Sequence, residues 1–147
     1  VEAGGAEQPL NLAYDSASGA VLAVDQGMEN LTRYKEKMIP GFVSKNPGNR
    51  VVALEPESGK LLWETPVGQG PVALRLDAAR KRLFVTNRSS GSVSVLDTDR
   101  HSVAETVPLP PHPNSLALDE KTGTAFVSVK LPFEKIKEKE SVARITL

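Results

Sequence analysis

Basic and aromatic side chains alternate in one stretch of the sequence, which contains Arg33, Tyr34, Lys35 and Lys37. This combination is typical of single-stranded nucleic-acid binding, because bases stack on aromatic rings while Lys and Arg contact the phosphates. A second stretch, residues 130–140, begins at Lys130 and places Phe133 among further lysines. The same patterns also occur in solvated loops, whose aromatic residues anchor the loop to the domain beneath it. The residues alone leave both interpretations open.

Other residue types that could carry chemistry are sparse. His112, close to Asn114, could act as a ligand or a base, or could pack within a turn. The sequence has two histidines and no cysteine, too few for a His-rich metal site or a zinc site built on Cys. Asp15, Asp77 and Asp119 each end a similar segment, where an aspartate usually accepts hydrogen bonds from the backbone of the following turn. We therefore expect no catalytic residue, no metal and no cofactor.

The overall charge of the chain is balanced, with 18 basic and 18 acidic residues among 147. Net charge therefore indicates neither a nucleic-acid partner nor an acidic one, although local clusters of charge still can. The lack of cysteine excludes disulfides and thiolate nucleophiles. No stretch approaches about 18 consecutive apolar residues, so we expect no membrane insertion.

A segment of eight residues recurs along the chain, as Gln8–Asp15, Gly70–Asp77 and His112–Asp119. The last two copies are separated by about 40 residues, and the segments after them match as well, since Arg82–Asn87 aligns with Thr124–Val129. Repetition at this interval indicates one supersecondary unit stacked against copies of itself.

Each repeat contains four short segments rich in Val, Leu, Phe and Thr that are separated by turn residues, which predicts four antiparallel strands. In the middle repeat the strands are expected at Val72–Asp77, Arg82–Asn87, Ser92–Asp97 and Val103–Leu109. Four antiparallel strands per unit of about 40 residues are typical of a β-propeller blade. We predict an all-β propeller of about three blades: residues 8–69 with a long insertion at 26–49, residues 70–111, and an incomplete blade at 112–147 that lacks its outer strand.

Fewer than three full blades cannot close a ring, because propellers contain about four to eight. We expect the chain to be part of a longer propeller whose remaining blades complete the circle. The alternative is self-association, in which several copies cover one another's open sheet faces and edges.

Two short motifs resemble those of a known family. Phe84–Asn87 and Phe126–Val129 are similar to the Tyr-Val-Thr-Asn motif that names the YVTN family of β-propeller repeats, and His112–Leu118 with Val142–Leu147 resembles the closing repeat of a bacterial periplasmic member. The resemblance covers residues 70–147 well and the first blade more weakly. It implies a seven-bladed ring, a periplasmic or secreted location, no known catalytic activity and an ability to bind single-stranded DNA.

The connections between predicted strands vary in length on one rim only. If the strands are lettered a to d from the centre outward, the b-to-c and d-to-a connections share a rim. The b-to-c connection is short in the middle blade, at residues 88–91, and long in the other two, which indicates a working surface. The residues predicted to bind a ligand on this rim are Arg33, Tyr34, Lys35, Lys37, Arg88, His112, Asn114 and Lys130.

The sequence thus predicts a non-enzymatic binding or scaffold module whose rim contacts single-stranded DNA or an extended peptide. The alternative is the propeller portion of an enzyme, lactonase-like or associated with a quinone dehydrogenase, whose catalytic groups lie in other blades. A third option is a structural role in which the insertions contact another subunit.

Overall fold

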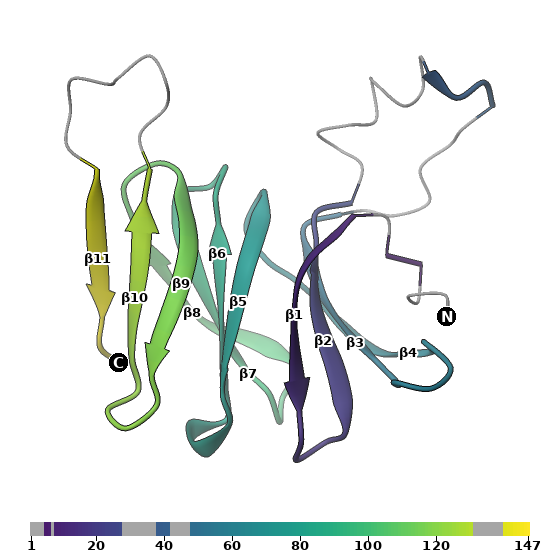
Figure 1. Ribbon diagram of the computed structural model, residues 1–147, viewed down its shortest axis with the longest axis horizontal. Coiled ribbons are helices and arrows are strands. Elements are labelled where there is room, and N and C mark those ends of the chain that lie inside the picture. Colours follow the sequence, from purple (N-terminus) through teal and green to yellow (C-terminus); the bar gives the residue numbers. More distant parts are fainter. Residues whose placement is uncertain (1–4, 7, 28–37, 42–47, 131–139) are drawn as a thin grey trace.

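The computed structural model describes residues 5–6, 8–27, 38–41, 48–130 and 140–147. Its strands form three antiparallel sheets that stand side by side (Figure 1). Blade 1 consists of β1 (Pro9–Asp15), β2 (Ala20–Asp25), β3 (Arg50–Leu54) and β4 (Leu61–Pro66). Blade 2 consists of β5 (Pro71–Asp77), β6 (Arg82–Asn87), β7 (Ser92–Asp97) and β8 (Ser102–Pro108). Blade 3 consists of β9 (Pro113–Asp119), β10 (Thr124–Val129) and β11 (Ser141–Ile145).

The strands of each blade follow one another in sequence order across the sheet, and the first strands of neighbouring blades lie next to each other. This is the arrangement of propeller blades, so the predicted all-β propeller class is confirmed. The expected strands of blade 2 agree with the observed ones to within one residue at each end. A short 3-10 turn, η1 (Ala78–Arg80), follows β5. Among the described residues no helix is long and apolar enough to cross a bilayer.

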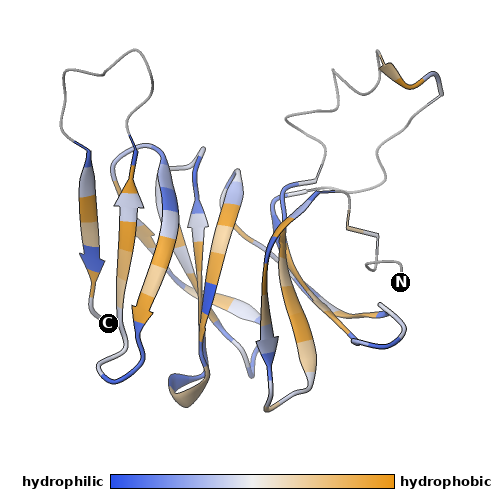
Figure 2. Ribbon diagram, in the orientation of Figure 1, coloured by the Kyte–Doolittle hydropathy of each residue, from blue (hydrophilic) through white to orange (hydrophobic). Residues whose placement is uncertain are grey.

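Side chains that alternate along the inner strands of blade 2 pack against its two neighbouring blades. Val93 and Val95 of β7 pack toward blade 3 with Phe84, Leu116 and Val127, and all five are at most 3% exposed. The opposite face of blade 2 packs against blade 1 through Leu74, Leu83, Val85 and Leu96. Figure 2 shows the resulting apolar bands along the strands and hydrophilic residues at many of the turns. Both faces of the middle blade are therefore core.

The outer faces of blades 1 and 3 show what a neighbouring blade contributes. Leu12 of β1 is 61% exposed, whereas Leu74, at the same place in β5, is fully buried. Phe126 of β10 is 39% exposed, although its counterpart Phe84 in β6 is fully buried. Burial at these positions is supplied by the adjacent blade and not by the residue's own sheet.

Acidic residues shape the turns at one end of the blades, which we call the turn rim. Their carboxylates each accept a hydrogen bond from a backbone N–H two or three positions later, in the turns that begin at Asp15, Glu55, Asp77, Asp97 and Asp119. Four positions after the acid the backbone is left-handed, at Gly19, Gly59, Lys81, His101 and Gly123. Glycine adopts this conformation without steric cost, and other residues need compensating contacts. The expectation that the recurring aspartates cap turns is confirmed.

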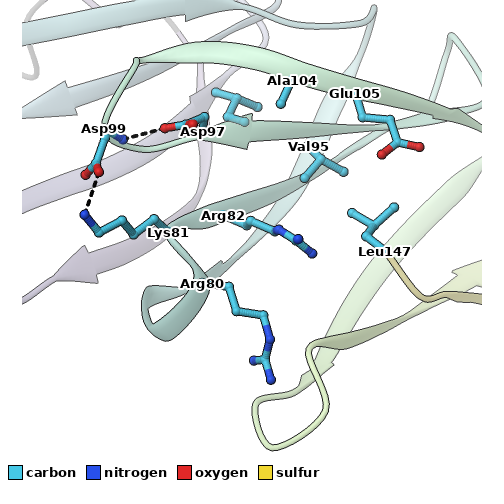
Figure 3. Close-up of a pocket in the computed structure, with 10 residues that line it drawn as sticks. Arg80, Lys81, Arg82, Val95, Asp97, Asp99, Ala104, Glu105 and Leu147 are labelled. Atoms are coloured by element: carbon cyan, nitrogen blue, oxygen red, sulfur yellow. Dashed lines mark hydrogen bonds and ion pairs between the residues drawn. The ribbon is translucent and has the colours of Figure 1, made fainter.

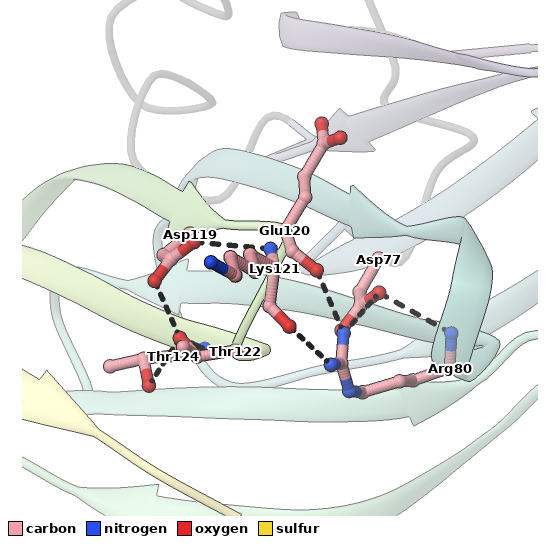
Figure 4. Close-up of polar contacts among 7 residues, drawn as sticks. All are labelled: Asp77, Arg80, Asp119, Glu120, Lys121, Thr122 and Thr124. Atoms are coloured by element: carbon pink, nitrogen blue, oxygen red, sulfur yellow. Dashed lines mark hydrogen bonds and ion pairs between the residues drawn. The ribbon is translucent and has the colours of Figure 1, made fainter.

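Arg80 joins the turn rim of blade 2 to that of blade 3 (Figure 4). One guanidinium nitrogen donates to the Asp77 carboxylate and to the backbone carbonyl of Glu120 at 3.0 Å, and the other donates to the carbonyl of Lys121 at 3.0 Å. Gly123 leaves room for the side chain, because a Cβ there would lie 2.7 Å from Arg80 Nε. The planar fork of donors thus connects two turns that are distant in the sequence.

Trp63 and His101 form a contact between blades 1 and 2. Their rings are stacked, with centroids 4.5 Å apart and planes inclined by 11°. The hydroxyl of Thr65, also on β4, donates to the carbonyl oxygen of His101 at 2.6 Å. Blade 1 therefore holds the left-handed residue of a turn in blade 2, where φ of His101 is 52°.

We expect Arg80→Ala to lower the free energy of unfolding by about 1.5 kcal/mol, because it removes charged hydrogen bonds between two blades. Arg100→Ala is the matched control, since Arg100 occupies the same turn position but its side chain is 83% exposed and lies 3.7 Å from Asp97. Its removal should change stability little. Urea unfolding of both variants measures the difference. Equal stabilities would contradict the role given to Arg80.

Candidate binding rim

The connections at the other end of the blades lie together, and we call this end the loop rim. Backbone hydrogen bonds link the two kinds of connection found there: Arg88 N donates to Gly70 O at 2.8 Å, and Lys130 N donates to His112 O at 3.1 Å. The ends of β2 and β10, where the long insertions begin, are on this same rim (Figure 1). The connections of variable length and the connections that lead from one blade to the next therefore lie on the same surface.

The structure places four of the predicted binding residues on this rim. They lie on neighbouring blades, with Arg88 on blade 2 and His112, Asn114 and Lys130 on blade 3. The other four, Arg33, Tyr34, Lys35 and Lys37, lie outside the residues that the structure describes. Phe133 also lies outside them.

Arg88 and Lys130 hold equivalent positions, each directly after the second strand of its blade. Both residues are exposed, and within the described part of the chain neither side chain forms a hydrogen bond or an ion pair. Their backbone is fixed by the bonds to Gly70 and His112. Two cations are thus available on a rigid base, which is what recognition of phosphate or carboxylate groups requires.

His112 occupies the place that Gly70 has in blade 2, and both residues have φ of 65°. A left-handed backbone costs a residue with a Cβ about 1–2 kcal/mol. The bond from Lys130 N to the His112 carbonyl helps to hold this turn, and the side chain is half-buried. No cluster of potential metal ligands is found among the described residues. These observations support a turn role for His112 on the loop rim.

Asn114 connects blade 3 to blade 2 mainly through its backbone. Its carbonyl oxygen accepts a hydrogen bond from the buried hydroxyl of Thr86 at 3.1 Å. Its side-chain nitrogen donates to the hydroxyl of Ser115 at 3.3 Å. The residue is therefore positioned by the fold, and its amide is less available than the two cations.

A buried charged cluster, which was not predicted from the sequence, lies where the first insertion begins and ends. Asp25 is fully buried and accepts hydrogen bonds from the backbone of Gln8 and Gly27 and from Arg50 Nε at 3.2 Å. Arg50 also pairs with Glu64. Buried charges need such partners, since an uncompensated one is costly. The cluster fixes β2 and β3 where residues 26–49 begin and end, and the signal in the sequence is a charged pair flanking that insertion.

A pocket of ≈ 300 Å³ lies on the turn rim, between blade 2 and Leu147 (Figure 3). Two of its charged groups, Lys81 and Asp99, form an ion pair with each other. Lys81 Nζ lies 2.6 Å from the Asp99 carboxylate, which raises the pKa of Lys81. The backbone N–H of Arg100 lowers the pKa of Asp97, with a further contribution from the N–H of Asp99. The pocket is thus lined by charges of both signs at the turn end of blade 2, separate from the loop rim.

Comparisons with known proteins bear on the whole arrangement. No family model matches the chain. The chain is 29% identical over 123 residues to YncE of Salmonella typhimurium and to YncE of Salmonella typhi, both described as uncharacterized proteins. The chain resembles YncE. The alignment covers 79% of this chain and 35% of each YncE protein, so the chain spans about a third of the length of these relatives. The predicted resemblance to a bacterial propeller protein is confirmed.

Two solved structures share the fold. Hydrazine synthase of Kuenenia stuttgartiensis matches 88% of this chain and 30% of its own, with a TM-score of 0.63 and 19% identity. Glutaminyl cyclase of Myxococcus xanthus matches 81% of this chain and 49% of its own, with a TM-score of 0.51 and 14% identity. At these identities the likeness shows the fold alone.

Asp119 allows a test of the turn-capping role. The hydroxyl of Thr122 donates to it at 2.6 Å and is the main reason that the pKa of Asp119 lies below its ordinary value. A carboxyl group with a lowered folded pKa adds stability above its unfolded pKa of about 3.9, and this stability is lost as pH falls through the folded value. We expect Asp119→Asn to lower the melting temperature at neutral pH and to flatten its decline below about pH 4.

Circular-dichroism melts between about pH 2 and pH 7 measure both effects. Glu120→Gln is the control, because this neighbouring side chain is exposed and should leave the acid profile nearly unchanged. If Asp119→Asn and the unmodified chain lose stability in parallel on acidification, Asp119 does not stabilise its turn as a carboxylate.

Proposed function

We propose that this chain is a non-enzymatic binding module and that its loop rim contacts single-stranded nucleic acid. The observation that carries the proposal is the pair of exposed, unpaired cations, Arg88 and Lys130, at equivalent positions of adjacent blades. A flexible polyanion lying across the blades meets one cation on each of them. The backbone of His112 is bonded to that of Lys130 on the same rim, so its half-buried ring is a further candidate for contact with a base.

Two further observations support a binding role over a catalytic one. The recurring aspartates Asp15, Asp77 and Asp119 stabilise turns, because each accepts a hydrogen bond from the backbone of the turn that follows it. Within the described ranges no group of potential metal ligands comes together. The known relatives add no substrate, since YncE is described as uncharacterized and the two enzymes share the fold alone.

The double variant Arg88→Ala, Lys130→Ala tests the rim. We expect it to bind a fluorescein-labelled oligo-dT more weakly than the unmodified chain between about 50 and 200 mM salt. Each lost phosphate contact should reduce the slope of log K against log salt by about 0.7, which makes about 1.4 for the pair. Fluorescence anisotropy at several salt concentrations gives both the affinity and the slope.

The matched control is Arg100→Ala, Lys121→Ala, which removes the same two residue types from exposed positions on the turn rim. This control changes the net charge equally and should keep the slope of the unmodified chain. Equal losses in the two double variants would show a general charge effect and remove the loop rim as the binding surface. Absence of oligo-dT binding by the unmodified chain at low salt would remove the nucleic-acid function itself.

A further inference from the structure

A second pocket, of ≈ 420 Å³, lies on the turn rim between blades 1 and 2. Blade 1 contributes the turn that follows β1, with Asp15, Ala17 and Ser18. Blade 2 contributes residues of β5 and of its two turns, among them Leu76 and Asp99. The volume is within the range of about 300–1,000 Å³ that is usual for small-ligand sites. We call this cavity the Asp15 pocket.

Asp15 is a buried carboxylate that forms no ion pair within the described part of the chain, where it is 9% exposed. The other two buried aspartates of the described residues, Asp25 and Asp77, each pair with an arginine. Asp15 accepts hydrogen bonds from the backbone N–H of Ala17 at 3.1 Å and from the hydroxyl of Ser18 at 2.6 Å. A carboxylate has about four lone-pair sites, so it can also accept from a cation. An unpaired buried charge is costly, which favours such a partner.

The contact between blades 2 and 3 shows which cation suits this place. Arg80 follows Asp77 by three residues, just as Ser18 follows Asp15 by three. The guanidinium of Arg80 donates to the Asp77 carboxylate and reaches two backbone carbonyls of the next blade (Figure 4). Serine is too short to bridge two blades in this way, so the equivalent space between blades 1 and 2 stays open.

The blade 2 side of the Asp15 pocket corresponds to the turn of blade 3 that accepts the guanidinium. Ala78, the first residue of this turn in blade 2, lines the pocket. The place of Gly123 is taken by Lys81, which narrows the pocket from that side. The ammonium group of Lys81 lies 2.6 Å from the Asp99 carboxylate and is engaged there (Figure 3). Asp15 therefore keeps an uncompensated charge beside an open space.

The residues of the lining favour an organic cation over an anion or a metal ion. Asp15 and Asp99 face one lysine, Lys81, so one negative charge is left over when His101 is neutral. Within the described residues no group of three potential metal ligands comes together. A guanidinium is weakly hydrated and presents its donors in a planar fork, so it is easily desolvated beside a carboxylate. Leu76 adds an apolar surface for an alkyl stem.

We propose that the Asp15 pocket binds a guanidinium group, presented by an arginine side chain of a partner protein or by a small solute. The guanidinium donates to the Asp15 carboxylate, as Arg80 does to Asp77, and its alkyl stem contacts Leu76. The pocket lies on the turn rim, so this binding is separate from nucleic-acid binding at the loop rim and does not rest on it.

Two probes distinguish the sources of the guanidinium. N-acetylarginine methylamide represents an arginine residue in a peptide, and n-propylguanidine represents a free solute. In titrations of the ¹⁵N-labelled chain followed by NMR, we expect both to shift the amide signals of Ala17 and Thr98, which line the pocket. Tighter binding of the arginine derivative would indicate a partner protein, and equal binding would indicate a small solute. The uncharged citrulline derivative has nearly the same shape and should bind at least about tenfold more weakly than the arginine derivative.

Asp15→Asn removes the charge of the carboxylate, and we expect it to weaken binding of N-acetylarginine methylamide by at least about tenfold. Asparagine can still accept the hydrogen bonds of the turn, and thermal melts check that the variant folds. Asp119→Asn is the matched control, because Asp119 ends the equivalent strand of blade 3 and is not part of the Asp15 pocket. This control should bind the probe as the unmodified chain does.

A second pair of variants tests the pocket with Asp15 intact. Lys81→Gly widens the pocket and removes a competing cation, so the probe should bind at least as tightly as it does to the unmodified chain. Glycine is compatible with the left-handed backbone at this position, where φ is 55°. Ser18→Arg together with Lys81→Gly reproduces the combination of Arg80 and Gly123. The new arginine should occupy the pocket and weaken binding of the probe by at least about tenfold.

Three results would overturn the proposal. The first is an absence of shifts at Ala17 and Thr98 with both guanidinium probes at millimolar concentration. The second is equal affinity for the arginine and citrulline derivatives. The third is equal binding by Asp15→Asn and Asp119→Asn, or by Lys81→Gly with and without Ser18→Arg. The titrations contain no nucleic acid, so these results leave the function of the loop rim to its own test.

Discussion

Burial between adjacent blades is the constraint on which the rest of this structure depends. Each sheet is thin, and a side chain on either face is removed from water only when another sheet covers it. Leu74 and Phe84 are fully buried in the middle blade, while their counterparts Leu12 and Phe126 on the outer faces are not. The alternation of side chains along the strands therefore serves two interfaces at once, and a change of register by one residue would exchange them.

The turns of the turn rim have nearly the same shape, whereas the connections of the loop rim differ in length. On the turn rim, five acidic residues hold five short turns in nearly the same shape, and long-range contacts of Arg80 and His101 lock neighbouring blades together. On the loop rim, connections of different length leave from strand ends that are themselves fixed, as the buried cluster of Asp25 and Arg50 shows. Loops carried on a rigid frame are where proteins usually place binding residues.

The repeats made most of the fold predictable, because matching segments expose both the strand boundaries and the alternation that buries Val93 and Val95. The exposed positions of Arg88 and Lys130 followed from the same alignment. Contacts between blades could not be found in this way. Arg80 reaches the carbonyls of Glu120 and Lys121, and a carbonyl has no signature in the sequence. Trp63 and His101 are likewise joined only by the stacking of whole sheets.

The partners of Arg80 in blade 3 are main-chain oxygens, so the contact does not depend on which side chains those residues carry. The side chains of Glu120 and Lys121 can be exchanged without removing an acceptor, whereas Gly123 must leave room for the guanidinium and Asp119 must hold the turn. The contact between blades 2 and 3 should therefore tolerate substitution of the two residues whose carbonyls accept from Arg80. Shuffling or duplication of blades would preserve it as long as the turn keeps its backbone shape and its glycine.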